Sequence, residues 1–259
     1  MDLGIRGKQA LVCGASKGLG FGCAEALAKE GVNLIINART ADTLKVAAEQ
    51  LRQKYGVEVI EAPADITTET GRESVLALCS NIDILVTNAG GPPPGTWSDW
   101  ERDDFIAALD ANMLTPIALM KALMPNMIAN NWGRVVNITS VSVKSPIPVL
   151  GLSNSARAGL TGYVAGTARQ VAQSGVTINN LLPGLHATDR ARNLDTSAAQ
   201  AEGLTVEQVK QRNFQNIPAA RYGTPEEFGA ACAFLCSQHA GYIVGQNILL
   251  DGGSFKSTM

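Results

Sequence analysis

Three glycines near the amino terminus have the spacing of a phosphate-binding turn. Gly14, Gly18 and Gly20 follow the short apolar run Gln9–Cys13 and come directly before an apolar helical pattern. Glycine in such a turn permits positive φ and lets the backbone approach a ligand closely. A helix that begins there presents free N–H groups and the positive end of its dipole to a phosphate. The spacing predicts a nucleotide site at this turn, and the alternative is an ordinary tight turn.

Two cations lie where the ribose of such a nucleotide is recognised. The second apolar run ends at Asn37-Ala38-Arg39-Thr40, with no carboxylate before Asp42, and Lys17 lies inside the glycine turn. In dinucleotide-binding folds an acidic residue at this strand end binds a 2′-hydroxyl, whereas a basic residue accommodates a 2′-phosphate. Lys17 and Arg39 therefore predict NADP(H) rather than NAD(H), unless Arg39 only solvates the start of a helix.

These residues need a scaffold that brings them together. Short apolar runs alternate with longer amphipathic stretches along the whole chain. Continuous apolar strands between helices are typical of a parallel sheet covered on both faces, here a single α/β domain over residues 1–259 with a doubly wound, Rossmann-type sheet. Strands are expected at Gln9–Cys13, Val32–Asn37, Val57–Glu61, Asp83–Thr87, Arg134–Ile138, Val176–Leu181 and Asn247–Leu250, and helices at Leu19–Glu30, Ala41–Tyr55, Thr68–Cys79, about 101–130, 151–173 and Thr224–Cys236.

One polar stretch interrupts this alternation after the sixth strand. The segment between Gly184 and Tyr222 is Ala-rich and too long for an ordinary loop in a compact domain. A short helix over Thr205–Asn213 is expected within it. Because the stretch follows a strand on the carboxyl side of the sheet, we expect residues 188–221 to form a substrate lid. The alternative is a mobile surface excursion.

The composition excludes several classes of function. The 259 residues include 21 Lys+Arg and 23 Asp+Glu, for a net charge of −2, and 46% are hydrophobic. A globular chain with a large core has this composition, whereas a disordered chain or a basic nucleic-acid-binding surface does not. No run approaches the roughly 18 consecutive apolar residues of a membrane span. Five cysteines without metal-ligand spacing predict no metal site and reduced thiols in a cytoplasm.

The order of the motifs resembles the short-chain dehydrogenase/reductase family, particularly its 3-oxoacyl-acyl-carrier-protein-reductase-like members, over about residues 5–253. The family's T-G-x-x-x-G-x-G motif is matched from Cys13 to Gly20, and its last strand by Gly245–Gly253. The resemblance implies an NADP(H)-dependent reductase of a small carbonyl compound that assembles as a homotetramer. The cofactor contacts expected from the motifs are Gly14, Ser16, Lys17, Gly18, Leu19, Gly20, Arg39, Asp65, Ile66, Asn88, Ala89, Gly90, Arg157, Pro183, Gly184, His186 and Thr188.

The family's catalytic set is Asn, Ser, Tyr and Lys, and this chain keeps the first two. Asn112 matches the Asn on the long helix, and Ser140 matches the Ser at the end of the fifth strand. The Tyr and Lys positions are held by Ser153 and Arg157, and the surrounding helix aligns without a gap. A serine hydroxyl is a far weaker acid than a phenol, and arginine does not relay protons. We therefore expect these four residues to act with an atypical proton donor.

Two further residues bear on that proton donor. Pro116 clashes with the carbonyl four residues before it, which belongs to Asn112. A carbonyl freed in this way can hold a water, as the family's proton relay requires, and the alternative is a kink for packing only. His186 follows Pro183-Gly184, and its imidazole either protonates an alkoxide at neutral pH or simply points into the lid.

Three functions are compatible with these residues. The first is an NADP(H)-dependent reductase with an altered proton donor, which we expect. The second is a catalytically silent NADP(H)-binding sensor or partner subunit. The third is a halohydrin-dehalogenase-like enzyme, because those relatives have Arg at the Lys position. They keep the Tyr and lose the glycine turn, however, and this chain does the reverse.

Overall fold

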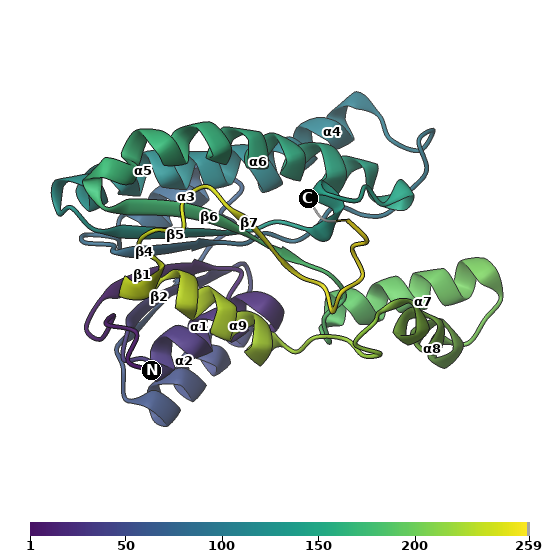
Figure 1. The fold of residues 1–259 in the computed structure, drawn as a ribbon, viewed down its shortest axis with the longest axis horizontal. Helices are drawn as coiled ribbons and strands as arrows, with labels where there is room; N and C mark the ends of the chain where they lie inside the picture. The colour runs from purple at the N-terminus through teal and green to yellow at the C-terminus, as the bar shows by residue number, and fades with distance from the viewer. Residues whose placement is uncertain (258–259) are drawn as a thin grey trace.

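The computed structural model describes residues 1–257 and contains a seven-stranded sheet in which all strands are parallel (Figure 1). Its order, β3-β2-β1-β4-β5-β6-β7, reverses direction between β1 and β4, which confirms the doubly wound fold. Ligands bind such sheets at the carboxyl ends of the strands near this point. The strands are β1 Gln9–Cys13, β2 Asn33–Ala38, β3 Val59–Pro63, β4 Ile84–Thr87, β5 Gly133–Ile138, β6 Val176–Pro183 and β7 Asn247–Leu250.

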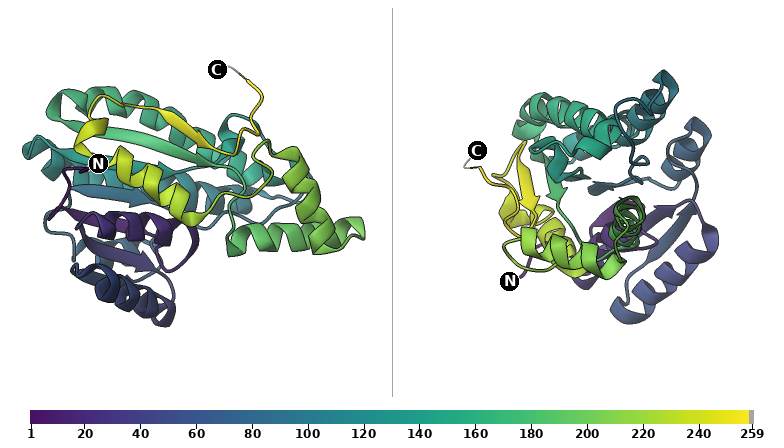
Figure 2. Two further views of the ribbon diagram at one scale, coloured as in Figure 1. Left: turned by 60° about the horizontal axis from the view of Figure 1, so that its bottom comes forward. Right: turned by 90° about the vertical axis from the view of Figure 1, so that its right-hand side faces the viewer.

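Helices cover the sheet in two separate layers (Figures 1 and 2). Helices α1, α2 and α9 lie on one face, whereas α3, α5 and α6 lie on the other. Successive residues of a strand enter different cores, so that Leu11 packs in one and Val12 in the other. This double burial is why the strands read as continuous apolar runs. The helices are α1 Gly18–Lys29, α2 Ala41–Tyr55, α3 Glu69–Leu76, α4 Arg102–Leu109, α5 Thr115–Ala129, α6 Gly151–Val171, α7 Asp189–Glu202, α8 Val206–Asn216 and α9 Pro225–Leu235.

The long helix expected over about 101–130 is interrupted at Asn112. Helix α4 is followed by a π-helical turn, η1, over Asp110–Leu114, and α5 then begins at Thr115. The Thr115 amide donates to the carbonyl of Asp110, five residues back, where an α-helix uses the fourth. Pro116 comes next, and in a regular α-helix its ring would clash with the carbonyl of Asn112. The proline therefore accounts for a local change of helix type at a residue that the sequence marks as functional.

The polar stretch after β6 folds into two helices that extend beyond the carboxyl edge of the sheet (Figures 1 and 2). Helix α8 confirms the expected short helix, whereas the longer α7 was not expected. Thr188 caps α7 by accepting a hydrogen bond from the amide of Ala191, and Gly203 ends it with a φ of 67°. The buried Asp195 carboxylate accepts the Tyr222 hydroxyl at 2.9 Å, which fastens α7 to the segment after α8.

One helical run combines length with an apolar composition. By these two measures, Arg102–Ala129 is the one run among the described residues that is long and apolar enough to cross a membrane. The same run covers the sheet, where Leu119, Met120 and Met127 are buried. Its core contacts account for part of its apolar composition, because 39% of its most apolar window is buried.

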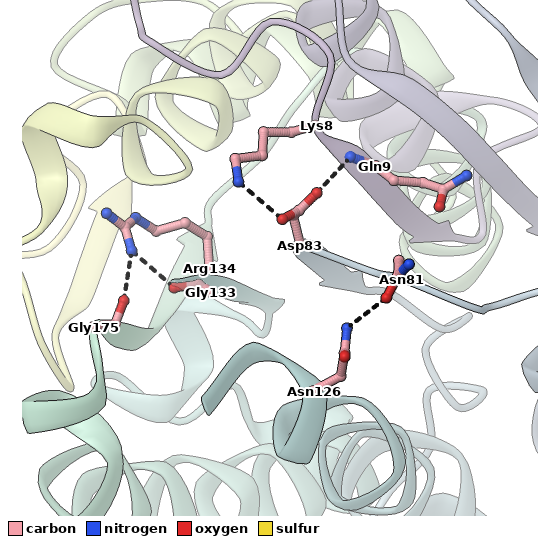
Figure 3. A network of polar contacts seen from close by, with 8 residues as sticks. All are labelled: Lys8, Gln9, Asn81, Asp83, Asn126, Gly133, Arg134 and Gly175. Carbon is pink, nitrogen blue, oxygen red and sulfur yellow. Dashed lines mark hydrogen bonds and ion pairs between the residues drawn. The ribbon is translucent and has the colours of Figure 1, made fainter. Parts of the chain in front are cut away.

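Polar contacts fix the amino ends of the strands (Figure 3). The Asp83 carboxylate accepts hydrogen bonds from Lys8 Nζ and from the Gln9 amide, both at 3.0 Å. The buried Arg134 guanidinium donates to the carbonyls of Gly133 and Gly175. It also donates to the carbonyl of Ser237. This edge of the sheet is therefore occupied by its own contacts, and the chemistry-bearing residues lie at the opposite edge.

A ladder of polar side chains crosses the carboxyl half of the sheet. Thr87 Oγ1 donates to Asn137 Oδ1 at 2.7 Å, and Asn137 Nδ2 donates to Asn180 Oδ1 at 3.2 Å. Asn180 Nδ2 in turn donates to Asn247 Oδ1 at 2.7 Å. The four residues are register partners on β4, β5, β6 and β7. Because each bond joins two neighbouring strands, this amide ladder fixes the strand ends relative to one another.

Removing the centre of the amide ladder tests its role. Asn137→Ala leaves the buried Thr87 hydroxyl and Asn180 oxygen without these partners, so we expect the free energy of unfolding to fall by about 1–3 kcal/mol. Urea denaturation measures the change. The matched control is Asn126→Ala, which loses only an exposed bond to Asn81 and stays within about 0.5 kcal/mol of the wild type. Equal stability of the two variants contradicts the assignment.

Candidate active site

The glycine turn has the conformation that its spacing predicts. Gly14 and Gly18 have φ values of 60° and 61°, in the left-handed region that favours glycine. A Cβ placed on Gly20 lies 2.2 Å from the carbonyl oxygen of Gly14, so only glycine fits there. Helix α1 begins at Gly18 and directs its first N–H groups toward the turn. The turn is thus a backbone cradle for an anion.

The strands beside the turn add the expected cations and one amide. Arg39 is exposed at the end of β2. Asp65 lies just after β3, where hydrogen bonds from Thr67 and, to a smaller extent, the charge of Arg39 lower the pKa of its carboxyl. Asn88 follows β4 and donates from Nδ2 to the carbonyl of Gly14 at 3.4 Å. The structure therefore brings the ends of β1, β2, β3 and β4 to one edge.

Lys17 has a partner that the sequence did not indicate. Its Nζ is 2.6 Å from Oδ2 of Asp189, the first residue of α7. This ion pair, together with the proximity of Thr188 to Gly18, places the start of α7 over the glycine turn. Asp189 also lies 3.4 Å from Arg192. The first turn of α7 is therefore in contact with the cradle.

Arg157 is the most connected side chain of the site. It projects from α6, and 7% of it is exposed. Its Nε donates to Ser153 Oγ at 3.2 Å, and one terminal nitrogen donates to the Ile138 carbonyl at 2.7 Å. The other terminal nitrogen lies 3.5 Å from the carbonyl of Ala89. One guanidinium thus joins α6 to the end of β5 and to the loop after β4.

The charge of Arg157 has no acidic partner among the described residues. Burial, and then the positive charge of Arg190, lower the pKa of Arg157 to about 10. Ser153 is buried beside it, and its Oγ accepts the Nε–H. The hydroxyl proton of Ser153 is therefore available for another acceptor, and the adjacent cation strengthens such a bond.

The two remaining predicted catalytic residues lie on elements that pack against α6. Ser140 caps the short helix η2, Val141–Val143, and its Oγ accepts the amide of Ser142 at 3.0 Å. Asn112 is buried in η1, and its Nδ2 donates weakly to the carbonyl of Ala108 at 3.4 Å. Its Oδ1 is buried without a hydrogen-bond partner among the described residues. Such an acceptor fits an ordered water.

The ring of His186 packs away from this group. Its Nδ1 is 3.2 Å from the carbonyl oxygen of Gly184, and its ring meets the edge of Phe228 on α9. Burial lowers the pKa of His186, so its neutral form is favoured at pH 7. No described hydrogen bond joins its ring to Ser153 or Arg157. Its backbone, next to Pro183-Gly184 at the end of β6, remains at the carboxyl edge of the sheet.

Sequence reasoning missed one cation at this edge. Arg190, in the first turn of α7, donates from a terminal nitrogen to the carbonyl of Pro92 at 2.8 Å. Its guanidinium also lies against Gly91, where an added Cβ is 3.1 Å from it. Arg190 is far in sequence from Gly91 and Pro92, and α7 itself was not expected. No motif spacing therefore marked Arg190.

Known proteins match this chain over nearly its whole length. A family model described as enoyl-(acyl carrier protein) reductase matches residues 14–254. The chain is 32% identical to a 3-oxoacyl-[acyl-carrier-protein] reductase of Aquifex aeolicus, over 98% of this chain and 100% of that one. It is 30% identical to an NADPH-dependent reductase of Bacillus subtilis, over 96% and 98%. The crystal structure of L-sorbose reductase from Gluconobacter frateurii with NADPH and L-sorbose superimposes with a TM-score of 0.94 at 30% identity, covering 99% and 100%.

The close fit of the glycine turn can be tested with two alanine substitutions. Gly20→Ala puts a methyl group against the Gly14 carbonyl, which cannot relax by side-chain rotation, so we expect a loss of at least about 1 kcal/mol of stability. Gly162→Ala is the control, because a Cβ there meets nothing within 4 Å on α6 and alanine favours a helix by up to about 1 kcal/mol. Thermal denaturation measures both. A Gly20→Ala protein that melts with or above the wild type refutes the tight fit.

Proposed function

The chain belongs to the short-chain dehydrogenase/reductase family, and from this premise we propose that it is an NADP(H)-dependent oxidoreductase that reduces a small carbonyl compound with an atypical proton donor. The observation that carries the proposal is the bond from the buried Arg157 to Ser153, at the edge where the glycine cradle lies. The two residues replace the phenol and ammonium of the family motif with a hydroxyl held by a guanidinium.

The residues at the carboxyl edge fit the cofactor. The cradle of Gly14, Gly18 and Gly20, with Ser16 and Leu19 in the same turn, suits a pyrophosphate because its backbone is open and its cations lie beside it. Arg39, and Lys17 when it exchanges Asp189 for the ligand, suit the 2′-phosphate that distinguishes NADP(H). We assign the remaining contacts to Asp65 and Ile66 after β3, to Asn88, Ala89 and Gly90 after β4, to Arg157, and to Pro183, Gly184, His186 and Thr188 after β6.

The side chains around α6 perform the proton chemistry in this proposal. Bound NADPH supplies the hydride that the carbonyl carbon receives. Ser153 accepts a bond from Arg157 and donates its own proton to the substrate oxygen, while the guanidinium stabilises the negative charge that develops there. Ser140 donates a second hydrogen bond to the same oxygen. Asn112 holds a water that passes a proton from the solvent to Ser153, since its Oδ1 is a buried, unpartnered acceptor.

The surroundings of the site complete the proposal. Residues 188–221, with α7 and α8, act as the substrate lid, because Lys17 and Arg190 both connect the start of α7 to the cofactor edge. The chain assembles as a homotetramer in the cytoplasm. Support for the assembly comes from α4 and the turn η1, where Phe105, Ile106 and Leu114 are exposed.

A second candidate function is an NADP(H)-binding sensor or partner subunit without turnover. It is favoured by the residue at position 153, because a serine hydroxyl is a much weaker acid than the phenol of the family. Both candidates need the same cradle and the same cations. They differ in whether NADPH is oxidised when a carbonyl compound is added.

The preference for NADP(H) depends on Arg39. Arg39→Asp places a carboxylate where the 2′-phosphate binds and where a 2′-hydroxyl is otherwise recognised, so we expect NADPH to bind at least about 10-fold more weakly and NADH more tightly. Fluorescence titration with each cofactor measures both constants. Equal affinity of the wild type for the two cofactors is incompatible with the assignment.

The proposed proton donor is tested with Ser153→Ala. General acid assistance contributes about 10²–10⁴-fold, so we expect kcat for NADPH oxidation with a panel of ketones, diketones and acyl thioesters to fall at least about 100-fold. The NADPH dissociation constant should stay the same. Ser155→Ala is the matched control, because that hydroxyl is bonded to the backbone of its own helix and its loss should leave kcat unchanged.

Three outcomes separate the candidates. A selective loss of kcat in Ser153→Ala supports the reductase and its donor. Unchanged turnover in this variant refutes the donor while the reductase stands. Tight NADPH binding by the wild type without oxidation of any carbonyl compound on the panel identifies the second candidate.

A further inference from the structure

Two guanidinium groups lie on the same short segment at the carboxyl edge. Arg157 contacts the carbonyl of Ala89 from α6, and Arg190 donates to the carbonyl of Pro92 from α7. Gly91 lies between Ala89 and Pro92 in the chain, and a Cβ added to it would be 3.1 Å from the Arg190 guanidinium. The two cations are close enough that the charge of Arg190 contributes to lowering the pKa of Arg157. Two like charges are therefore held together by the fold.

Neither cation has an acidic partner within the described part of the chain. The carboxylate closest to them along α7, that of Asp189, is engaged by Lys17 and Arg192. The buried Arg134 at the other edge of the sheet also lacks a carboxylate, but it is satisfied by three carbonyl bonds of 3.1 Å or less. Arg190, in contrast, makes one described hydrogen bond, so most of its N–H groups remain available.

The backbone at Gly90, on the segment that both arginines contact, faces open space. A Cβ placed on Gly90 meets no atom within 4 Å, and Gly90 is exposed. A Cβ on Gly91, in contrast, presses against Arg190. The segment thus combines an open backbone position at Gly90 with contacts to the exposed Arg190 and the buried Arg157. An anion placed here relieves the repulsion between the two arginines.

We propose that the substrate is a carbonyl compound with a carboxylate group, which Arg190 binds while its carbonyl oxygen lies at Ser153 and Arg157. This inference rests on the proposed reductase function. A planar guanidinium binds a carboxylate through two parallel hydrogen bonds, which fixes orientation as well as charge. Arg190 thereby determines which end of an oxo acid faces the buried Ser153. A cofactor phosphate offers the same anionic chemistry, and the experiment separates the two sources.

The test compares matched acids and esters. The substrates are 2-oxobutanoate, acetoacetate and levulinate, each with its methyl ester, and 2,3-butanedione serves as a neutral reference. We expect kcat/KM for one of the acids to exceed that of its ester by at least about 10-fold, the effect of a charged hydrogen bond. Arg190→Gln should abolish this ratio through KM and leave the NADPH dissociation constant unchanged. Arg192→Gln, an exposed neighbour on α7 that pairs with Asp189, is the matched control and should keep the ratio.

A binding measurement makes the inference independent of turnover. Malonate is titrated calorimetrically into the complex of the protein with NADP⁺. Binding to the wild type and to Arg192→Gln, weakened at least about 10-fold in Arg190→Gln, supports the carboxylate site.

Each alternative outcome has a distinct meaning. Reduction of butanedione without any preference for acids overturns the inference and leaves the reductase intact. An increased NADPH dissociation constant in Arg190→Gln, with equal losses for acids and esters, assigns Arg190 to the cofactor and also overturns it. Malonate binding through Arg190 without oxidation of NADPH by any substrate supports the anion site and overturns the reductase function.

Discussion

The site depends on a buried positive charge that holds three separate segments together. Arg157 reaches from α6 to the end of β5 through the Ile138 carbonyl and to the loop after β4 through the Ala89 carbonyl. Its Nε also donates a hydrogen bond to Ser153, one helical turn earlier on α6. A buried cation is costly unless polar groups surround it, and here those groups are the backbone of the site itself. The position of each segment is therefore coupled to the same charge.

The sheet supplies the rigid frame on which this charge acts. The reversal of strand order between β1 and β4 places the glycine turn beside the loop that carries Asn88 and Ala89. The amide ladder from Thr87 to Asn247 then fixes β4, β5, β6 and β7 in register. Because buried amides need partners, this ladder admits few alternative registers. The strand ends that carry the site are thus positioned by contacts made inside the sheet.

The sequence was sufficient to predict the sheet and the cations Lys17 and Arg39, but it predicted neither the partner of Lys17 nor the position of Arg190. Strand and helix periodicity predicted the sheet, and the glycine spacing predicted the turn, because both depend on neighbours in the chain. The pairing of Lys17 with Asp189, the helix α7 and the place of Arg190 against Gly91 depend on segments far apart in sequence. The caps of α7, Thr188 and Gly203, were a readable local signal. The contacts of Arg190 had no such signal.

Ser153 and Arg157 are best understood as one unit, because they are joined by a hydrogen bond on adjacent turns of α6. A lysine ammonium is a compact charge on a flexible stem, which suits the tuning of a nearby phenol. A guanidinium has a planar fork of donors, and Arg157 uses it to bind Ser153, Ile138 and Ala89 at once. Without the Ser153 hydroxyl, the Nε–H of Arg157 would be buried without this acceptor. Without Arg157, the Ser153 hydroxyl would have no neighbouring cation to strengthen its own hydrogen bond.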